Sequence, residues 1–316
     1  MTFVMYLHEK TNKFSTEILN LNMLNKFKKL KQAFQQLGRL KYQLEEINQA
    51  LGRIELRQLE KIDSNDIWDN EFKVFSQNGE DGIIQFLVRK LEIKEKIFIE
   101  FGVENYLESN TRFLLRNNNW SGLILDGSAD NINYIKNDSI YWRHNLTAIQ
   151  AFITKDNINN LIAKNGITGE IGLLSIDIDG NDYWIWEAID VINPAIVIIE
   201  YNFRFGKDKA VTIPYDENFV RYKAHYSTIY YGASLKALVQ LGNKKGYTFV
   251  GCNSTGCNAF FVRTDLKPSE IKELTVEEGY LAGKFRESRN KSCKLIYLSH
   301  QEELQILSSL PLVDIQ

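Results

Sequence analysis

What this sequence has least of is cysteine, long apolar runs and net charge. Its 3 cysteines lack the C-x-x-C spacing of a zinc site, so we expect reduced thiols in a cytoplasmic protein. No run of about 18 apolar residues occurs, and the apolar part of the amino-terminal stretch is too short for a signal peptide. The net charge of −2 gives no reason to expect nucleic acid as a partner. These absences argue against a membrane-spanning protein, a disulfide scaffold and a nucleic-acid binder.

The amino-terminal segment has a helical pattern of its own. Two interleaved heptad series consist of Leu30, Leu37, Leu44 and Leu51, and of Ala33, Leu40, Ile47 and Ile54. Alternating steps of three and four residues are the a and d positions of a coiled coil, and Leu at a with Ile at d favours more than two strands. We expect residues 1–62 to be a helical oligomerisation arm and residues 63–74 a linker. A long amphipathic helix folded back on its own domain is the alternative.

Strand and helix patterns alternate in residues 75–265. Short runs rich in β-branched residues fall at 96–102, 121–127, 139–145, 170–179 and 194–202, and helical segments separate them. This order predicts a parallel sheet covered on both faces. A helix at 232–246 and two strands at 247–252 and 258–263 follow. The fold expected is a doubly wound, Rossmann-like α/β domain with a seven-stranded sheet and an antiparallel carboxy-terminal hairpin. Residues 266–316 would be a helical extension.

Polar residues stand where the expected strands end. They are Glu100, Asp126, Asn145, Asp177, Asp179, Glu200 and Asn202. Ligands of doubly wound sheets bind at the carboxyl ends of the strands. The sequence therefore places a candidate ligand site along this edge.

The loop after the first strand, "IFIEFGVENYLESNT", limits the choice of cofactor. A dinucleotide site needs G-x-G-x-x-G, but Gly102 is the only glycine here and it lies between Glu100 and Glu104. Carboxylates repel a pyrophosphate, whereas S-adenosylmethionine carries a cationic sulfonium and an ammonium. Asp126, at the end of the second strand, matches the acid that accepts hydrogen bonds from ribose hydroxyls. The loop therefore favours S-adenosylmethionine over NAD or FAD.

Several longer stretches carry a family resemblance. They are "FSQNGEDGIIQFL", "FIEFGVENYLESNTRFLL", "WSGLILDGS", "LLSIDIDGNDYWIWEAI", "IEYN" and "YYGASLKALVQLGNKKGYTFVGCNSTGCNAFFVR". Together they resemble class I S-adenosylmethionine-dependent methyltransferases of the FkbM-like branch, which is often associated with bacterial capsule or lipopolysaccharide synthesis. The resemblance covers roughly residues 75–263.

The resemblance implies roles for residues at the first three strand ends. Glu100 and Gly102 would lie against the methionine and ribose parts of the cofactor, Asp126 would hold the ribose, and Asn145 would lie near adenine. The remaining cofactor-binding residues implied are Gln77, Asn110, Thr111 and Asp177, and Glu80 and Asp81 would help close the methionine end. The sequence departs from the family loop at Tyr106, where a second glycine is usual.

The stretch "LLSIDIDGNDYW" places Asp177, Asp179 and Asp182 close together after the fourth strand. Methylation of a hydroxyl requires removal of its proton, which a divalent cation or a general base assists. One interpretation makes Asp179, Glu200 and Asn202 ligands of Mg²⁺ or another hard cation, with Asp177 an alternative from the fourth strand. A second makes Asp179 the base, with no metal. A third is structural: Asp182 caps the following helix and Asp177 orders the loop.

His225 lies in the loop between the fifth strand and the last helix, and an imidazole there suits proton abstraction. The candidate catalytic residues are thus Asp179, His225 and Asp177. The same loop is rich in aromatic residues suited to stacking on a sugar or a base.

These patterns predict an O-methyltransferase acting on a sugar hydroxyl of a nucleotide sugar or surface-polysaccharide precursor. It would use S-adenosylmethionine and assemble through its amino-terminal helix. The alternatives are a methyltransferase for a small non-sugar acceptor, and a non-catalytic protein of the same fold that binds a partner through its arm. Nucleic-acid methylation is disfavoured because no DPPY-like motif follows the fourth strand.

Overall fold

The computed structural model describes residues 2–316, which divide into one compact unit up to residue 51 and another of residues 52–316. The helices are α1 Thr2–Ile62, α2 Glu80–Lys90, α3 Arg112–Asn117, α4 Ala129–Asn137, α5 Ser139–Arg143, α6 Ile158–Lys164, α7 Asp182–Ala188, α8 Arg221–Ala224, α9 Leu235–Lys244, α10 Val276–Gly279 and α11 His300–Leu307. The strands are β1 Ile97–Phe101, β2 Ser121–Asp126, β3 Leu146–Gln150, β4 Gly169–Ile176, β5 Ile192–Glu200, β6 Val211–Thr212, β7 Tyr247–Cys252, β8 Asn258–Arg263, β9 Ser288–Arg289, β10 Leu295–Ile296 and β11 Val313–Asp314. No helix within residues 2–316 combines the length and apolar character needed to cross a membrane.

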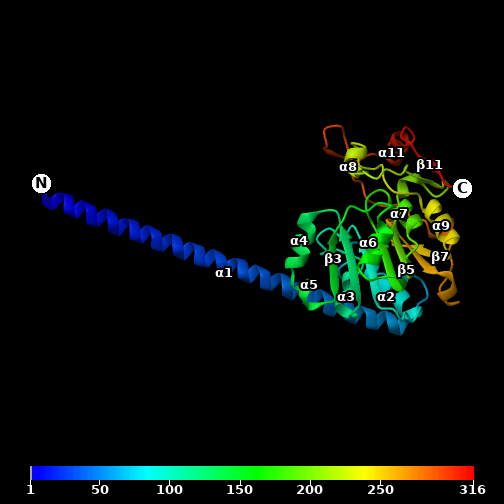
Figure 1. Ribbon diagram of the computed structural model, residues 1–316, viewed down its shortest axis with the longest axis horizontal. Helices are drawn as coiled ribbons and strands as arrows, with labels where there is room; N and C mark the ends of the chain where they lie inside the picture. The colour runs from blue at the N-terminus through cyan, green and yellow to red at the C-terminus, as the bar shows by residue number, and fades with distance from the viewer. Residues whose placement is uncertain (1) are drawn as a thin grey trace. The chain divides into compact units, whose positions relative to one another are not determined.

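The second unit is built on a seven-stranded sheet in the order β3-β2-β1-β4-β5-β8-β7 (Figure 1). The strands β1 to β5 pair in parallel, whereas β8 is antiparallel to both β5 and β7. The strand order reverses between β1 and β4. The predicted fold, with its antiparallel hairpin, is confirmed.

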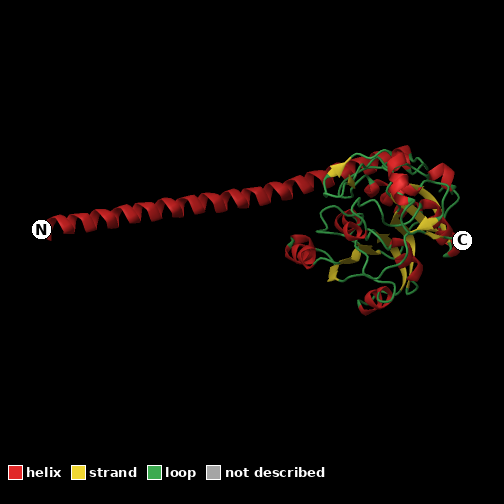
Figure 2. Cartoon of the chain, turned by 90° about the horizontal axis from the view of Figure 1, so that it is seen from above, coloured by secondary structure: helices red, strands yellow, loops and turns green. Residues whose placement is uncertain are grey.

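Helices cover the sheet on two sides, so the strands lie between helical layers (Figure 2). One apolar cluster packs α6, α7 and α9 on the sheet, with Trp186 and Phe261 at its centre, 4.9 Å between ring centroids. The other packs α2, α3 and α4 on the opposite face, around residues such as Phe98 and Leu114. Strands buried on both faces need continuous apolar runs, which is why β1, β4 and β5 could be predicted.

The structure corrects one predicted strand. Residues 139–143 form helix α5, and the third strand begins only at Leu146. The side chain of Asp138 accepts a hydrogen bond from the backbone N–H of Ile140 at 2.9 Å and so caps this helix. A capped first turn outweighs the β preference of Ile140 and Tyr141.

The segments on either side of the expected domain also differ from expectation. Residues 63–74, expected as a linker, bury Ile67, Phe72 and Val74, and the end of α1 packs there through Leu56 and Leu59. Residues 266–316, expected to be helical, contain only the short helices α10 and α11, and β11 pairs antiparallel with β6. Both segments therefore belong to the packed body of the second unit.

Candidate active site

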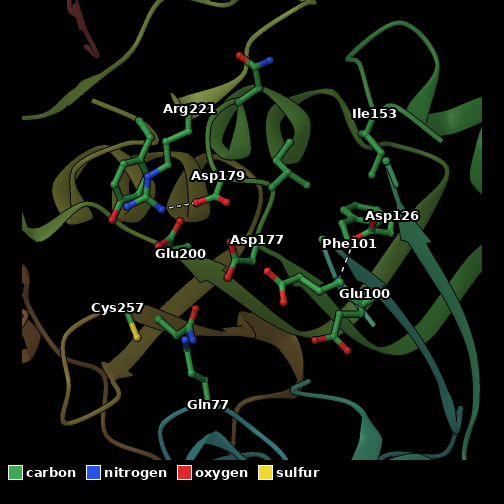
Figure 3. A pocket seen from close by; sticks show the side chains of 18 of the residues that line it. Gln77, Glu100, Phe101, Asp126, Ile153, Asp177, Asp179, Glu200, Arg221 and Cys257 are labelled. Atoms are coloured by element: carbon green, nitrogen blue, oxygen red, sulfur yellow. Dashed lines mark hydrogen bonds and ion pairs between the residues drawn. The ribbon is translucent and has the colours of Figure 1, made fainter. Parts of the chain in front are cut away.

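A cavity of about 580 Å³ opens at the carboxyl ends of β1, β2, β4 and β5. This is the edge at which the strand order reverses, where doubly wound sheets bind their ligands. One side is formed by the loops after β1, β2 and β3, and includes Gly102, Asp126 and Ile153. The other side is formed by Glu200, the loop that follows it, and Phe285 and Glu287 from the carboxy-terminal segment. Figure 3 shows the acidic side chains of Asp177, Asp179 and Glu200 grouped in the cavity.

Glu100 organises the loop after β1 rather than offering a free carboxylate. One oxygen accepts from the N–H of Asn110 at 2.8 Å, and the other accepts from the hydroxyl of Ser109 and from the N–H and hydroxyl of Thr111. Each carboxylate oxygen has about two acceptor sites, so the three donors saturate one oxygen, and the oxygen that accepts from Asn110 keeps about one site. Burial raises the pKa of Glu100 above its usual value despite these donors. Glu100 thus sets the position of Asn110, which lines the cavity.

Gly102 lies where β1 and β4 approach each other. Its φ is +70°, and a Cβ atom there would stand 1.6 Å from the carbonyl oxygen of Asp177. No other residue can occupy this space without separating the two strand ends. The glycine is therefore required by the approach of the β4 backbone, and not only by a ligand as the sequence analysis expected.

Asp126 ends β2 and is buried at the cavity wall. One carboxylate oxygen accepts from the N–H of Glu104 at 2.8 Å, and the other from the N–H of Ser128 at 2.8 Å and the side-chain amide of Asn131 at 3.1 Å. Three donors leave about one acceptor site of this carboxylate for a ligand. Asp126 therefore joins the loops after β1 and β2 and keeps some capacity to accept a hydrogen bond.

The three aspartates after β4 differ in their surroundings and hydrogen bonds. Asp182 accepts from the N–H groups of Ile178 and Gly180 at 2.8 and 2.9 Å, so it closes the turn, and burial raises its pKa to about 6. Asp179 sits in that turn with a φ of +56° and an exposed side chain. Asp177 lies below it, towards the sheet. The predicted helix cap is wrong: Asp182 is the first residue of α7, Asn181 is its N-cap, and the Asp182 carboxylate bonds to the turn that precedes the helix.

Asp177, Asp179 and Glu200 form one acidic cluster. An oxygen from each lies within 4.8 Å of the others. Burial, and then repulsion between the neighbouring carboxylates, raises the pKa of both Asp177 and Glu200 well above the usual range. The Oε2 atom of Glu200 is buried and has no hydrogen-bond partner among the described residues 2–316. Such an atom is costly unless a proton, a cation or a ligand meets it.

Arg221, from α8, supplies the positive charge nearest to this cluster. Its guanidinium donates to the Asp179 carboxylate, and its Nε donates to the backbone oxygen of Thr228 at 2.7 Å. The same group lies over the ring of Tyr231, 3.8 Å from the centroid. Burial, and then the negative charge of Glu200, raises the pKa of Tyr231, whereas the charge of Arg221 acts to lower it. Arg221 therefore offsets part of the negative charge of the acidic cluster, and its contact with Tyr231 holds that ring at the cavity wall.

A buried ion pair joins the cavity wall to the carboxy-terminal segment. Arg204 lines the cavity, is 1% exposed, and donates through Nε to Glu303 of α11 at 2.9 Å. It also donates to the backbone oxygen of Phe285 at 3.4 Å. Residues 285–303 are in this way fixed against the loop that follows β5.

Most of the predicted site residues meet in this cavity. Those that line it are Gln77, Glu100, Gly102, Asn110, Asp126, Asp177, Asp179 and Glu200. Thr111 lies just behind the wall, where it is buried and bonded to Glu100. Glu80 and Asp81 are buried structural groups: Asp81 accepts from three backbone N–H groups, and Glu80 from the side chains of Asn253 and Asn258.

Three further predicted residues, in addition to Thr111, lie outside the cavity wall. Asn145 precedes β3 and bonds to Ser121 at the start of β2, so it belongs to the opposite edge of the sheet from the one expected. Asn202 is buried, donates to the carbonyls of Ile229 and Tyr231, and accepts from the backbone N–H of Arg204, so its amide holds the loop after β5 and is not among the residues that line the cavity. His225 is bonded to Ser227 at 2.6 Å and is not among the lining residues. Among the possible cation ligands, Asp177 occupies the position that the sequence analysis expected for Asn202.

Sequence reasoning missed several lining residues. Phe152 and Ile153 follow β3, and only the corrected position of that strand brings them to the cavity. Glu287 comes from the carboxy-terminal segment, which no local spacing connects with the strand ends. The density of aromatic residues in residues 203–231 was the one available signal, and Phe203, Phe219, Tyr222 and Tyr231 do line the cavity.

No protein-family model matches this chain, and no curated protein sequence matches it. Similar solved structures include the N-terminal domain of EvdMO1 with SAH bound, 12% identical, covering 67% of this chain and 95% of that one at a TM-score of 0.40. An O-methyltransferase from Bacillus cereus in complex with SAH is 15% identical, with 58% and 78% covered and a TM-score of 0.37. An S-adenosylmethionine-dependent methyltransferase from Clostridium acetobutylicum is 10% identical, with 55% and 87% covered and a TM-score of 0.34.

Proposed function

We propose that this protein is an S-adenosylmethionine-dependent O-methyltransferase that acts on a sugar hydroxyl. The observation that carries the proposal is the composition of one cavity at the switch point of the sheet. Its β1–β3 side offers Asp126 and the apolar residues Phe152 and Ile153, and its β4–β5 side offers an acidic cluster beside aromatic residues. The first side suits a nucleoside and the second suits a hydroxyl that must lose a proton.

The residues on the β1–β3 side fit S-adenosylmethionine. Asp126 keeps an acceptor site for a ribose hydroxyl, and Phe152 and Ile153 supply an apolar surface for a base. Gln77 and Asn110 offer amides nearer the acidic cluster. The acidic wall repels a pyrophosphate and favours a cationic ligand. S-adenosylmethionine, when bound, supplies a methyl group activated by its sulfonium.

The residues on the β4–β5 side would prepare the acceptor. Glu200 has a raised pKa, because it is buried beside other carboxylates, and a buried oxygen without a partner, so it is a stronger base than an exposed carboxylate and can take a proton from an acceptor hydroxyl. Asp177 lies beside it with a similarly raised pKa. Asp179 is tied to Arg221 and would hold the position of the cluster. In this mechanism Glu200 takes over the role of base that the sequence analysis assigned to Asp179 or His225.

The acidic cluster also fits a hard divalent cation such as Mg²⁺. Three carboxylates with oxygens within 4.8 Å of one another are suitable ligands, and the unpartnered oxygen of Glu200 is one of them. A cation there would polarise the acceptor hydroxyl and lower its pKa. With a cation bound, Asp177, Asp179 and Glu200 would be its ligands, and the cation would replace Glu200 as the group that prepares the hydroxyl for loss of its proton.

A sugar acceptor is favoured by the aromatic residues of the cavity. Phe203, Tyr231 and Phe285 line its β5 side, and the flat faces of aromatic rings suit stacking on sugar rings. The sequence resemblance to the FkbM-like branch points the same way, to nucleotide sugars or precursors of surface polysaccharide. The free thiols of Cys252, Cys257 and Cys293 are consistent with a reducing compartment, and we propose the cytoplasm.

Calorimetric titration with S-adenosylhomocysteine is the direct test. We expect wild-type protein to bind it, and Asp126→Asn to bind it at least about tenfold more weakly, because a ribose hydrogen bond and the joined loops are both lost. Asp179→Asn should keep the wild-type affinity and lose turnover with a sugar acceptor. Equal losses of binding in both variants would show that the two sides of the cavity are wrongly assigned.

The same titration distinguishes the alternatives. Addition of EDTA, and then of Mg²⁺, reports whether a cation contributes to binding or only to turnover. Cofactor binding without turnover over a library of sugars would favour the non-catalytic alternative. The absence of S-adenosylhomocysteine binding under every condition would remove the cofactor assignment.

We also propose that the chain assembles with further copies through α1. Its large apolar residues from position 23 to 54 are between 50% and 66% exposed: Met23, Phe27, Leu30, Phe34, Leu37, Leu40, Leu44, Ile47, Leu51 and Ile54. Their spacing of three and four residues is that of a helix that pairs with similar helices. An apolar stripe of this length needs to be covered in water.

We expect Leu37→Asp/Leu44→Asp to convert the oligomer into a monomer, because each charge would be buried in the helix contact. Sedimentation velocity measures the change. The matched control is Gln32→Asp/Gln35→Asp, which adds the same charge on the other side of the helix and should leave the oligomer intact. A wild-type monomer at micromolar concentration would contradict the assembly proposal.

A further inference from the structure

A small hairpin stands at the mouth of the cavity. The strands β9 and β10 pair antiparallel, Ser288 with Ile296 and Arg289 with Leu295. The hairpin is fixed to the loop after α8: the N–H of Arg289 donates to the oxygen of Ser227 at 3.1 Å, and the hydroxyl of Thr228 donates to the oxygen of Glu287 at 3.3 Å. Phe285 and Glu287, at its base, line the cavity. In Figure 1 it is the orange segment beside α8.

This hairpin carries an excess of positive charge. Its exposed cations are Lys284, Arg286, Arg289, Lys291 and Lys294. Glu287 is the one acidic residue between positions 284 and 297, and it faces Arg221 at 4.0 Å. Within residues 2–316, none of the five cations has a carboxylate within ion-pair distance. Because the whole chain has a net charge of −2, this local excess is not a general property of the surface.

Exposed aromatic rings lie among these cations. Tyr297 is 70% exposed and Tyr222, which also lines the cavity, is 69% exposed. The guanidinium of Arg286 stands 4.9 Å from the Tyr297 ring, and Lys291 stands 5.9 Å from the ring of Tyr226. A tyrosine that is two-thirds exposed does not serve a core, and exposed rings that stand beside cations near a cavity indicate a binding surface. Rings paired with cations suit a ligand with both sugar faces and negative charge.

From these observations we infer that the β9–β10 hairpin and α8 form a subsite for an anionic, sugar-containing acceptor. The sugar to be methylated enters between Tyr222 and Phe285, and the anionic portion lies along the hairpin on Lys291, Lys294 and Arg286. The negative charge is a phosphate or a carboxylate next to a sugar ring, a chemistry shared by nucleotide sugars and by acidic glycan chains. The inference rests on the proposed function, since it names the acceptor class of the same cavity.

Calorimetry with three sugar probes tests this subsite. UDP-N-acetylglucosamine carries a diphosphate, trigalacturonic acid carries carboxylates along a chain, and maltotriose is neutral. We expect the wild-type protein with saturating S-adenosylhomocysteine to bind one of the anionic probes at least about tenfold more tightly than maltotriose. Which anionic probe binds distinguishes a nucleotide-linked acceptor from a polymeric one.

Two variants and a control assign the binding to the hairpin. Lys291→Gln/Lys294→Gln should weaken the anionic probe by about tenfold and reduce the salt dependence of its binding. Tyr297→Ala should weaken it by a similar factor of about ten through loss of ring contact. Lys136→Gln/Lys164→Gln removes two exposed lysines from α4 and α6 and should leave binding unchanged.

The titration with S-adenosylhomocysteine tests the proposed function, and the titrations with sugars test the subsite, so a negative result in one can be told from a negative result in the other. S-adenosylhomocysteine binding with no anionic-sugar binding, or with binding that the hairpin variants leave intact, overturns the subsite. Hairpin-dependent binding of an anionic sugar without any S-adenosylhomocysteine binding supports the subsite and removes the methyltransferase proposal.

Discussion

Gly102→Ala is expected to unfold the cofactor side of the cavity and to abolish S-adenosylhomocysteine binding. The added Cβ atom would lie 1.6 Å from the carbonyl oxygen of Asp177, and the backbone φ of +70° disfavours any side chain. The obstructing atom is backbone on β4, so no side-chain rotation relieves the clash. We expect the free energy of unfolding to fall by more than about 3 kcal/mol, as for other severe backbone conflicts. Urea denaturation with and without S-adenosylhomocysteine measures both effects.

Gly127→Ala is the matched control for stability. Gly127 lines the same cavity, but a Cβ atom there would meet only a ring carbon of Phe152, at 3.9 Å. Its φ is not in the positive region. The control should therefore unfold within about 0.5 kcal/mol of wild type. If Gly102→Ala were equally stable, the contact between the ends of β1 and β4 would not be the constraint that we describe.

Arg204→Met is expected to cost about 3–5 kcal/mol of stability, because it leaves Glu303 buried without its cation. The two side chains are 1% and 7% exposed and are joined by a hydrogen bond of 2.9 Å. The backbone oxygen of Phe285 also loses a donor. Guanidinium denaturation followed by circular dichroism gives the change in the free energy of unfolding.

The double variant Arg204→Met/Glu303→Leu separates the charge effect from lost packing. Replacing both members of a buried pair by apolar residues is often close to neutral, so we expect most of the stability to return. The same double variant should keep S-adenosylhomocysteine affinity, since both residues lie away from the β1–β3 side. If the loss of unfolding free energy in the double variant equalled the sum of the losses in the two single variants, Arg204 and Glu303 would act independently.

The sheet was predictable because its strands are buried on both faces. Residues such as Ile196 to Ile199 in β5 are fully buried, and such a strand leaves an uninterrupted apolar run in the sequence. The strand predicted at 139–145 was wrong because Tyr141 and Trp142 are residue types that are common in strands. Only the cap from Asp138 and the start of pairing at Leu146 reveal the helix.

The acidic part of the site was predictable for a related reason. Parallel strands end at the same edge, so acids at the ends of β4 and β5 must approach one another, and Asp177, Asp179 and Glu200 do. Arg221 was not predictable as their partner, since it reaches Asp179 from a loop with no periodic pattern. Asn202 shows the opposite error: two residues beyond Glu200 along the chain, its side chain turns into the protein and holds the loop after β5.

The pairing of β11 with β6 determines when the two sides of the cavity can be completed during synthesis. The β1–β3 side uses residues 77–153, whereas the β4–β5 side also needs Arg221 and Phe285 and a loop strand that is paired by Val313 and Asp314. A chain emerging from the ribosome with its amino terminus first therefore has the residues of the β1–β3 side available well before those that complete the other side. The β4–β5 side would therefore be completed only after residues 313–314 have been synthesised and have paired with β6.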